Sequence, residues 1–332
     1  MDAWLKDNLV CPRDFTSLRE DGQTLVCEKD HAYPYVDGLP VMLVAGEPST
    51  HAHCHLTLDS LSAGDDKSDV APGGSGAQAS VDPFVQRSVA HTCGFYFAPV
   101  VGRLTEYPVP TLSMPKAYGE RFLDVGCNWG RWCISASRLG YKAVGIDPEI
   151  EAVQAARRVA KQVGVDAQYV VADARHLPFR PGSFDSVHSY SVLMHFAKED
   201  SAAAIWEMAR VLKPGGNSLV QMANTFGLRN LQIQIQRGWN KPLERSSFHT
   251  RYRTPAELMQ LFNQAFGSSK IEAEGFFSTS SGSFYMSELP LVYRVALKVS
   301  RALTQLSQIF PPLKYVADSL YMRSVRSAAG RM

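Results

Sequence analysis

The sequence predicts an α/β fold: a doubly wound, mostly parallel sheet, preceded by a small β-rich unit and followed by helices. Three observations support this prediction. From Arg121 onward, strand-like apolar runs alternate with helix-length segments, the pattern of a parallel sheet covered on both faces. Residues 1–45 instead contain short β-type segments separated by Asp-Gly turns. Residues 291–332 begin with an amphipathic helical stripe.

The N-terminal unit, residues 1–45, has too little apolar mass to fold without help. It contains two pairs of metal-ligating residue types, Cys11 with Asp14 and Cys27 with His31. Their Cys-x2-Asp and Cys-x3-His spacings are typical of zinc-ribbon knuckles, and zinc accepts thiolate, imidazole and carboxylate ligands in one tetrahedral shell. We therefore predict a zinc site that stabilises this unit. The alternative is a metal-free relic, because Asp14 stands where such sites have cysteine.

Residues 46–83 are predicted to be a flexible linker, because their later part is rich in Gly, Ser, Ala and Asp and shows no apolar period. The string HAHCH within them has metal-ligating residues but no predicted scaffold, so adventitious binding is expected there.

The main domain is predicted to span residues 84–290. Its strand-like runs are RFLDVG, KAVGID, AQYVVAD, FDSVHSY and NSLVQMA, and helical segments such as EAVQAARRVAKQVG lie between them. Residues 226–253 interrupt this alternation, and we expect that insertion to form a substrate pocket. A helix then follows with Thr254 as its N-cap and Pro255 in its first turn, before a strand at SKIEAEGFF.

Residues 291–332 are predicted to form C-terminal amphipathic helices, broken at Pro311-Pro312. The apolar stripe comprises Val292, Val295, Ala296, Val299, Leu303 and Leu306, with Arg294, Lys298, Arg301 and Gln305 opposite. Such a helix could pack on the core, cover the substrate cavity, dimerise or lie on anionic lipid. We predict a lid.

A ligand-binding loop is predicted at FLDVGCNWGRW, where an apolar strand ends in an acid and a glycine turn before a helix. Gly126 and Gly130 allow close backbone approach, and the helix N-terminus offers free N–H groups. The spacing is G-x-N-x-G, so the dinucleotide fingerprint G-x-G-x-x-G fails and NAD is disfavoured. The next strand ends in Asp147, where a carboxylate can accept both hydroxyls of a ribose, and a third strand ends in Asp173-Ala174.

These ordered motifs resemble the class I S-adenosylmethionine-dependent methyltransferases, in particular the small-molecule enzymes similar to those of ubiquinone and menaquinone biosynthesis. The resemblance covers residues 118–225 and rests on LDVGCNWG, GID, ADARHLPF, SFDSVHSYSVLMHF and VLKPGG in that order. It implies a Rossmann-like, seven-stranded sheet and S-adenosylmethionine as cofactor. The cofactor residues that it implies are Asp124, Gly126, Asn128 and Gly130 for the aminoacyl end, Asp147 for the ribose, and Asp173 with Ala174 for the adenine. Asn128 departs from the family, which has glycine at that position in many members.

The N-terminal unit looks like the zinc-ribbon protein that partners and activates tRNA and translation-factor methyltransferases. A zinc ribbon ahead of a methyltransferase domain also resembles bacterial 23S rRNA guanine methyltransferases.

Methyl transfer from a sulfonium needs in-line placement of a nucleophile and exclusion of water. Tyr190 and His195 follow the fourth strand, and we predict them as catalytic; His195 has an unperturbed pKa suited to proton transfer near neutrality. His195 could equally cap or pack the following helix. The cluster at residues 249–253 suggests an anionic or aromatic substrate gate, and an exposed charged loop is the competing interpretation. Its predicted substrate-binding residues are His249, Arg251, Tyr252 and Arg253.

Composition sets limits on the function. The chain has 332 residues, 45% of them hydrophobic, and 34 basic against 32 acidic residues. It can bury a core, and its net charge of +2 lacks the strong positive field of duplex nucleic-acid binders. With no basic, apolar leader pattern, no long apolar run and six sparse cysteines, the sequence predicts a reduced, cytoplasmic protein without transmembrane segments.

The leading hypothesis is therefore a methyltransferase that acts on a small molecule, at an oxygen, nitrogen or carbon atom. An RNA methyltransferase is the first alternative, because basic residues lie near the C-terminus: Arg294, Lys298, Arg301, Lys314, Arg323 and Arg326. A non-catalytic module that binds a partner is the second. The sequence determines neither the acceptor nor the oligomeric state.

Overall fold

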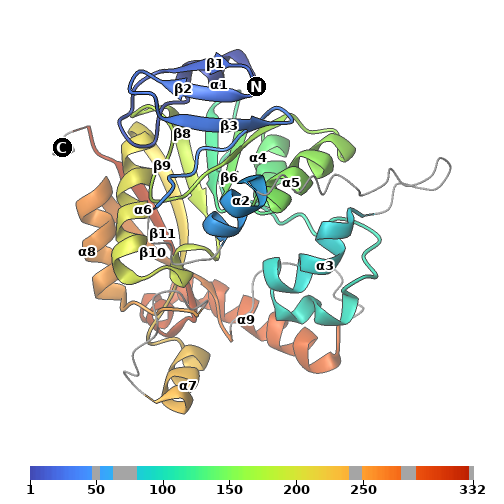
Figure 1. Cartoon of the computed structure of the whole chain (residues 1–332). Coiled ribbons are helices and arrows are strands. Elements are labelled where there is room, and N and C mark those ends of the chain that lie inside the picture. The colour runs from blue at the N-terminus through green and yellow to red at the C-terminus, as the bar shows by residue number, and fades with distance from the viewer. Residues whose placement is uncertain (47–52, 63–80, 239–248, 278–288, 329–332) are drawn as a thin grey trace.

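The computed structural model describes residues 1–46, 53–62, 81–238, 249–277 and 289–328 (Figure 1). Within these residues the chain forms a large sheet with helices on both faces and a small sheet at its N-terminus. Both features confirm the predicted fold class. No described helix is long and apolar enough to cross a membrane.

The large sheet has seven strands in the described part of the chain, in the order β10-β11-β9-β8-β5-β6-β7. Its strands are β5 (Arg121–Val125), β6 (Lys142–Asp147), β7 (Ala167–Val171), β8 (Phe184–Ser189), β9 (Leu212–Ala223), β10 (Gly267–Gly275) and β11 (Ser319–Arg326). Strands β7, β6, β5, β8 and β9 pair in parallel. Strand β11 lies antiparallel between β9 and β10. The carboxyl ends of the parallel strands therefore share one edge, where ligands bind in this type of sheet.

Helices cover both faces of the large sheet (Figure 1). One face carries α4 (Arg131–Arg138) and α5 (Ile150–Gln162), and the other carries α6 (Lys198–Val211) and α8 (Pro255–Phe266). The predicted start of α8 is confirmed: the Thr254 hydroxyl accepts from the Glu257 amide, the Glu257 carboxylate accepts from the Thr254 amide, and Pro255 lies in the first turn. This reciprocal cap satisfies amide groups that a helix N-terminus otherwise leaves unpaired.

The N-terminal unit consists of α1 (Ala3–Asn8) and a four-stranded antiparallel sheet. Its strands are β1 (Leu18–Asp21), β2 (Thr24–Cys27), β3 (Ala32–Val36) and β4 (Leu39–Pro40). After β4 the chain runs along the edge strand of the large sheet, where the Met42 amide donates to the Val171 carbonyl at 2.7 Å. The Val10 amide donates to the Pro178 carbonyl at 2.9 Å. The small unit is thus bonded directly to the main domain.

The predicted linker differs from the structure where it is described. Helix α2 (His53–Ser62) occupies part of it, and α3 (Pro83–Thr92) begins at its end. The Thr57 hydroxyl donates to the Pro148 carbonyl at 2.8 Å, which anchors α2 beside α5. The glycine-rich stretch that motivated the linker prediction lies outside the described residues, as does His51 of the HAHCH string.

The C-terminal prediction is correct for one helix and wrong for one strand. Helix α9 (Leu291–Ile309) ends before Pro311, and the short 3-10 helix η3 (Pro311–Val316) follows. Residues 319–326, predicted as helical, form β11 instead. Hydrogen bonding to two neighbouring strands decides this, because a chain inserted between β9 and β10 pairs on both sides. The remaining helices are η1 (Phe95–Val100), η2 (Leu193–His195) and α7 (Leu228–Arg237), the last within the predicted insertion.

Candidate functional site

The glycine loop lies at the carboxyl edge of the sheet, between β5 and α4. The amides of Gly126 and Cys127 both donate to the Ile146 carbonyl, at 2.9 and 2.8 Å, which ties the loop to the neighbouring strand. Gly126 and Gly130 have φ angles of +78° and +82°. Asn128 also has a positive φ, +46°, and asparagine tolerates this conformation better than other side chains. The departure from glycine at this position is therefore compatible with the turn.

Steric contacts also require glycine at both positions. A Cβ atom on Gly126 would lie 2.3 Å from Cγ2 of Val192, and one on Gly130 would lie 2.5 Å from the Tyr169 hydroxyl. No side chain fits at such distances unless its neighbour moves. Glycine at these two positions therefore allows the loop backbone to pack directly against Val192 and Tyr169.

Asp147 lies at the end of β6, beside this loop. Its carboxylate accepts from the Asn128 amide at 3.0 Å and from the Glu149 amide at 3.1 Å. The side chain is half-buried, so it is held in place and still reachable from solvent. This is the arrangement that a ribose-binding carboxylate needs.

Asp124 is enclosed by protein. It is completely buried, and Oδ1 lies 3.0 Å from Nδ1 of His188 on the neighbouring strand. The His188 ring is also fully buried and packs 4.8 Å from the Trp132 ring, centroid to centroid. The pair thus supports the strands beneath the loop. A contact of Asp124 with the cofactor stays a prediction.

Asp173 also has protein partners. Its Oδ2 accepts from Nη2 of Arg175 at 2.6 Å and from Nε of Arg175 at 3.0 Å, and Sγ of Cys54 lies 3.8 Å from the same oxygen. Nη1 of Arg175 reaches Oδ1 of Asp200 at 3.4 Å. Ala174, next in the chain, is buried. The sequence analysis missed this ion-pair network, because its only signal in the sequence is the Asp-Ala-Arg spacing at residues 173–175. The adenine role of Asp173 and Ala174 stays a prediction.

Tyr190 follows β8 and reaches across the sheet edge to a carboxylate that the sequence analysis did not single out. Its hydroxyl donates to Oε1 of Glu274, a buried residue of β10, at 2.8 Å. Burial, together with the Glu274 charge, raises the pKa of Tyr190 well above its ordinary value. The phenol therefore stays protonated at neutral pH and can donate a hydrogen bond, but it cannot serve as a base.

His195 lies at the end of η2, and its surroundings move its pKa away from the near-neutral value expected from the sequence. Burial, with a smaller contribution from the charge of Arg251, lowers the pKa of His195 to about 4, and a hydrogen bond with the His249 backbone opposes this shift. The imidazole is therefore neutral at pH 7. At that pH it can accept a hydrogen bond, and as a proton acceptor it is weak.

The low pKa of His195 gives a prediction for stability. Between about pH 6.5 and pH 4 the unfolded chain binds a proton at His195 that the folded chain does not, so acid should destabilise the fold in this window. Between pH 7 and pH 4.5 we expect the free energy of unfolding to fall by roughly 2 kcal/mol less in His195→Gln than in the unaltered chain. Urea denaturation of both proteins at pH 7 and pH 4.5 would measure it. Identical pH dependences would contradict the prediction.

The predicted substrate cluster lies against η2 and α6. The Arg251 amide donates to the Met194 carbonyl at 2.7 Å, and the Arg251 guanidinium donates to the His195 carbonyl at 2.5 Å. Nη2 of Arg253 donates to the Ser201 hydroxyl at 2.9 Å. The structure thus places Arg251 beside His195 and Arg253 against the start of α6, where their guanidinium groups donate to backbone and side-chain oxygens. His249 is exposed and Tyr252 half-buried, and their contact with substrate stays a prediction.

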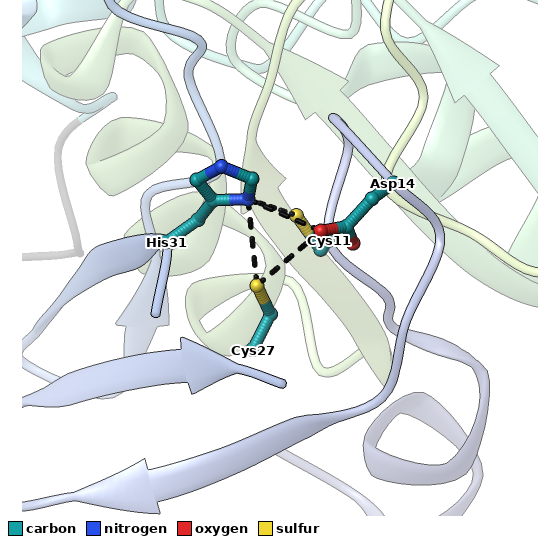
Figure 2. Close-up of side chains that lie close together, drawn as sticks. All are labelled: Cys11, Asp14, Cys27 and His31. Atoms are coloured by element: carbon teal, nitrogen blue, oxygen red, sulfur yellow. Dashed lines mark hydrogen bonds and ion pairs between the residues drawn. The ribbon is translucent and has the colours of Figure 1, made fainter. Parts of the chain in front are cut away.

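The predicted metal ligands converge in the N-terminal unit (Figure 2). The ligand atoms of Cys11, Asp14, Cys27 and His31 all lie within 4.8 Å of one another. Nδ1 of His31 lies 3.5 Å from the Cys11 sulfur, 3.4 Å from the Cys27 sulfur and 3.2 Å from Oδ2 of Asp14. The Cys27 sulfur lies 3.6 Å from the same Asp14 oxygen.

These four distances match four of the six edges of a zinc tetrahedron. With Zn–S bonds of about 2.3 Å and Zn–N or Zn–O bonds of about 2.0 Å, tetrahedral angles place sulfur about 3.5 Å from nitrogen or oxygen, and nitrogen about 3.3 Å from oxygen. Each of the four measured separations lies close to its expected value. Both cysteines are buried, as expected for a closed structural site.

Several known proteins are similar in sequence to the main domain of this chain. A methyltransferase-domain family model matches residues 122–216. The ubiquinone biosynthesis O-methyltransferase of Aeromonas salmonicida is 29% identical over 154 residues, covering 43% of this chain and 61% of that protein. The enzyme of the same name from Xanthomonas oryzae pv. oryzae is 37% identical over 107 residues, covering 32% of this chain and 44% of that protein. This chain thus spans less than two thirds of the length of these relatives.

Among solved structures, phosphoethanolamine N-methyltransferase 2 of Haemonchus contortus, in complex with S-adenosyl-L-methionine, aligns with 76% of this chain and 61% of its own, at 20% identity and a TM-score of 0.46. The family match includes β5, the glycine loop, α4 and the start of β9. Residues 122–216 thus match a methyltransferase domain, and the sheet order and glycine loop described above agree with the fold of the class I S-adenosylmethionine-dependent enzymes.

Proposed function

We propose that this chain transfers a methyl group from S-adenosylmethionine to a small-molecule acceptor. The observation that carries the proposal is the glycine loop, whose two positive-φ glycines leave no room for side chains beside the half-buried Asp147. Gly126 to Gly130 would hold the aminoacyl end of the cofactor, and Asp147 would accept the ribose hydroxyls. When bound, the sulfonium supplies an electrophilic methyl group.

The protein's part in this reaction is placement and exclusion of water. Tyr190 is fixed by Glu274 at the end of β8 and presents a protonated phenol there. Neutral His195 offers a hydrogen-bond acceptor on the following turn. We propose that these two groups position a hydroxyl acceptor, which gives its proton to solvent as its oxygen takes the methyl group and S-adenosylhomocysteine leaves. The O-methyltransferase names of the relatives support this choice of acceptor.

An RNA substrate is less well supported by the placement of the basic residues. Arg323 is paired with Glu272 of β10 at 3.2 Å, and the Arg326 guanidinium donates to the Arg210 carbonyl at 3.0 Å. Two of the residues that suggested RNA binding are therefore occupied within the fold.

Calorimetric titration with S-adenosylmethionine and S-adenosylhomocysteine tests the proposal. We expect both to bind, and we expect Asp147→Ala to weaken binding about tenfold, because the ribose hydroxyls lose a charged partner. Asp166→Ala is the matched control, because Asp166 is an exposed acid just before β7, at the opposite edge of the sheet. This variant should bind the cofactor like the unaltered chain. Absence of binding by the unaltered chain would refute the proposal.

We also propose that the N-terminal cluster binds one zinc ion as a structural centre. The agreement of four interligand distances with a tetrahedron supports it, together with a donor set of two sulfurs, one imidazole nitrogen and one carboxylate oxygen. The ion would cross-link the loop before β1 to the turn between β2 and β3.

A further inference from the structure

Helix α9 turns two serines toward the core and several of its large apolar side chains toward solvent. The side chains that it buries include two serines, Ser300 and Ser307, beside a single buried leucine, Leu297. The apolar stripe predicted from the sequence lies largely on the outer face. Four residues of the predicted stripe, Val292, Val295, Val299 and Leu306, are exposed. Together with Leu291 and Ile309 at the two ends of the helix, they form an apolar stripe whose members are each between 42% and 83% exposed.

The contacts of α9 explain this orientation. The Ser300 hydroxyl accepts from the Phe276 amide at 2.9 Å, so a polar side chain of the helix satisfies the backbone just after β10. The Ser307 hydroxyl donates back to the Thr304 carbonyl at 2.7 Å. With Ser300 and Ser307 facing inward, the side chains of Val295, Val299 and Leu306 lie on the outer side of the helix.

The charge around this exposed stripe has one sign. Between Leu291 and Ala317 the sequence contains four basic residues and no acidic one. Lys298 is exposed, next to the exposed Val299, and Arg294 and Arg301 lie on the same side of the helix, one turn before and one turn after. An apolar stripe flanked by cations is complementary to a surface that combines hydrocarbon with negative charge.

The helix lies at the end of the molecule opposite the N-terminal unit, where α7 also lies (Figure 1). Helix α7 carries two more exposed large apolar side chains, Leu228 and Ile235. Scattered exposed apolar residues are ordinary on protein surfaces, whereas a continuous stripe along one helix marks an interaction site.

We propose that the exposed face of α9 binds the surface of an anionic lipid bilayer, with the helix lying in the plane of the interface. The apolar stripe enters the boundary between headgroups and acyl chains, and the exposed Lys298 faces the lipid phosphates. This would replace the lid expected from the sequence: the stripe faces away from the protein, so it does not close over the sheet edge.

Vesicle flotation with the full chain tests the proposal. We expect binding to vesicles of phosphatidylcholine mixed equally with phosphatidylglycerol, and much weaker binding to phosphatidylcholine alone. Val299→Glu should reduce the partition coefficient at least about tenfold, because it places an acid in the apolar stripe. Lys298→Gln should reduce it about fivefold, the contribution of one basic residue near an anionic surface.

Val101→Glu is the matched control, since Val101 is 40% exposed, Val299 is 42% exposed, and Val101 lies in the turn after η1. It should bind vesicles like the unaltered chain. Thermal melts of all variants should coincide, because the altered side chains are exposed. Absence of vesicle binding, or binding that Val299→Glu leaves unchanged, would overturn the proposal. So would a dimer in light scattering that Val299→Glu dissociates, which would assign the face to a second copy. None of these readouts depends on methyl transfer.

Discussion

Replacing Gly126 with alanine should weaken S-adenosylmethionine binding by about 100-fold. Two costs combine at this position. A non-glycine residue at a φ of +78° costs about 1–2 kcal/mol. In addition, the new methyl group would lie 2.3 Å from Cγ2 of Val192, so either Val192 or the loop must move. Together these costs reach about 3 kcal/mol, or two powers of ten in a dissociation constant.

Two further variants separate the causes. Gly22→Ala introduces the same methyl group at a φ of +61° in the β1–β2 turn, where no atom lies within 4 Å of the added Cβ. It should lose stability slightly and bind cofactor normally. Gly126→Ala combined with Val192→Ala removes the steric contact and keeps the strained φ, so binding should recover in part. Calorimetric titration measures all three, and normal binding by Gly126→Ala alone would contradict the cradle assignment.

Replacing Cys27 with serine should abolish zinc binding and destabilise the N-terminal unit by about 3–5 kcal/mol. The ion would cross-link two loops of a small unit, and in small metal-dependent folds the free energy of metal binding contributes directly to the free energy of folding. Elemental analysis should find one zinc per chain in the unaltered protein and none in the variant. Thermal unfolding followed by circular dichroism should show an earlier transition for the variant.

Cys93→Ser provides the control for this experiment. Cys93 is also buried, at the end of α3, and lies outside the metal cluster. It should keep its zinc while losing the modest stability expected for a polar atom placed in a core. Cobalt substitution adds a direct test, because two thiolate ligands give intense charge-transfer absorption that Cys27→Ser should diminish. A zinc-free unaltered chain would contradict the assignment.

The sequence was sufficient for the main sheet, because burial on both faces forces continuous apolar runs and the glycine motif marks the first strand–helix turn. It was also sufficient for the start of α8, where Thr254 and Glu257 form a local reciprocal cap. For β11 the sequence was insufficient, because that strand owes its conformation to β9 and β10, which lie far from it along the chain.

The same distinction applies to the sites. The spacing of Cys11, Asp14, Cys27 and His31 indicated a metal cluster, because each pair lies within one knuckle, and the structure brings the two pairs together. The pKa of His195 could not be predicted, since burial and Arg251 lower it and both depend on tertiary packing. The link between Tyr190 and Glu274 joins residues 84 positions apart.

The sequence by itself thus determined which segments are strands of the parallel sheet, where the glycine loop lies and which residues can bind a metal. All of these follow from local periodicity and short spacing. Only the tertiary structure decided which face of α9 is exposed. The amphipathic pattern identifies two faces, but it does not say which of them meets the sheet. In the structure Ser300 faces inward, and its hydroxyl accepts from the Phe276 amide, which an apolar side chain at that position would leave unpaired.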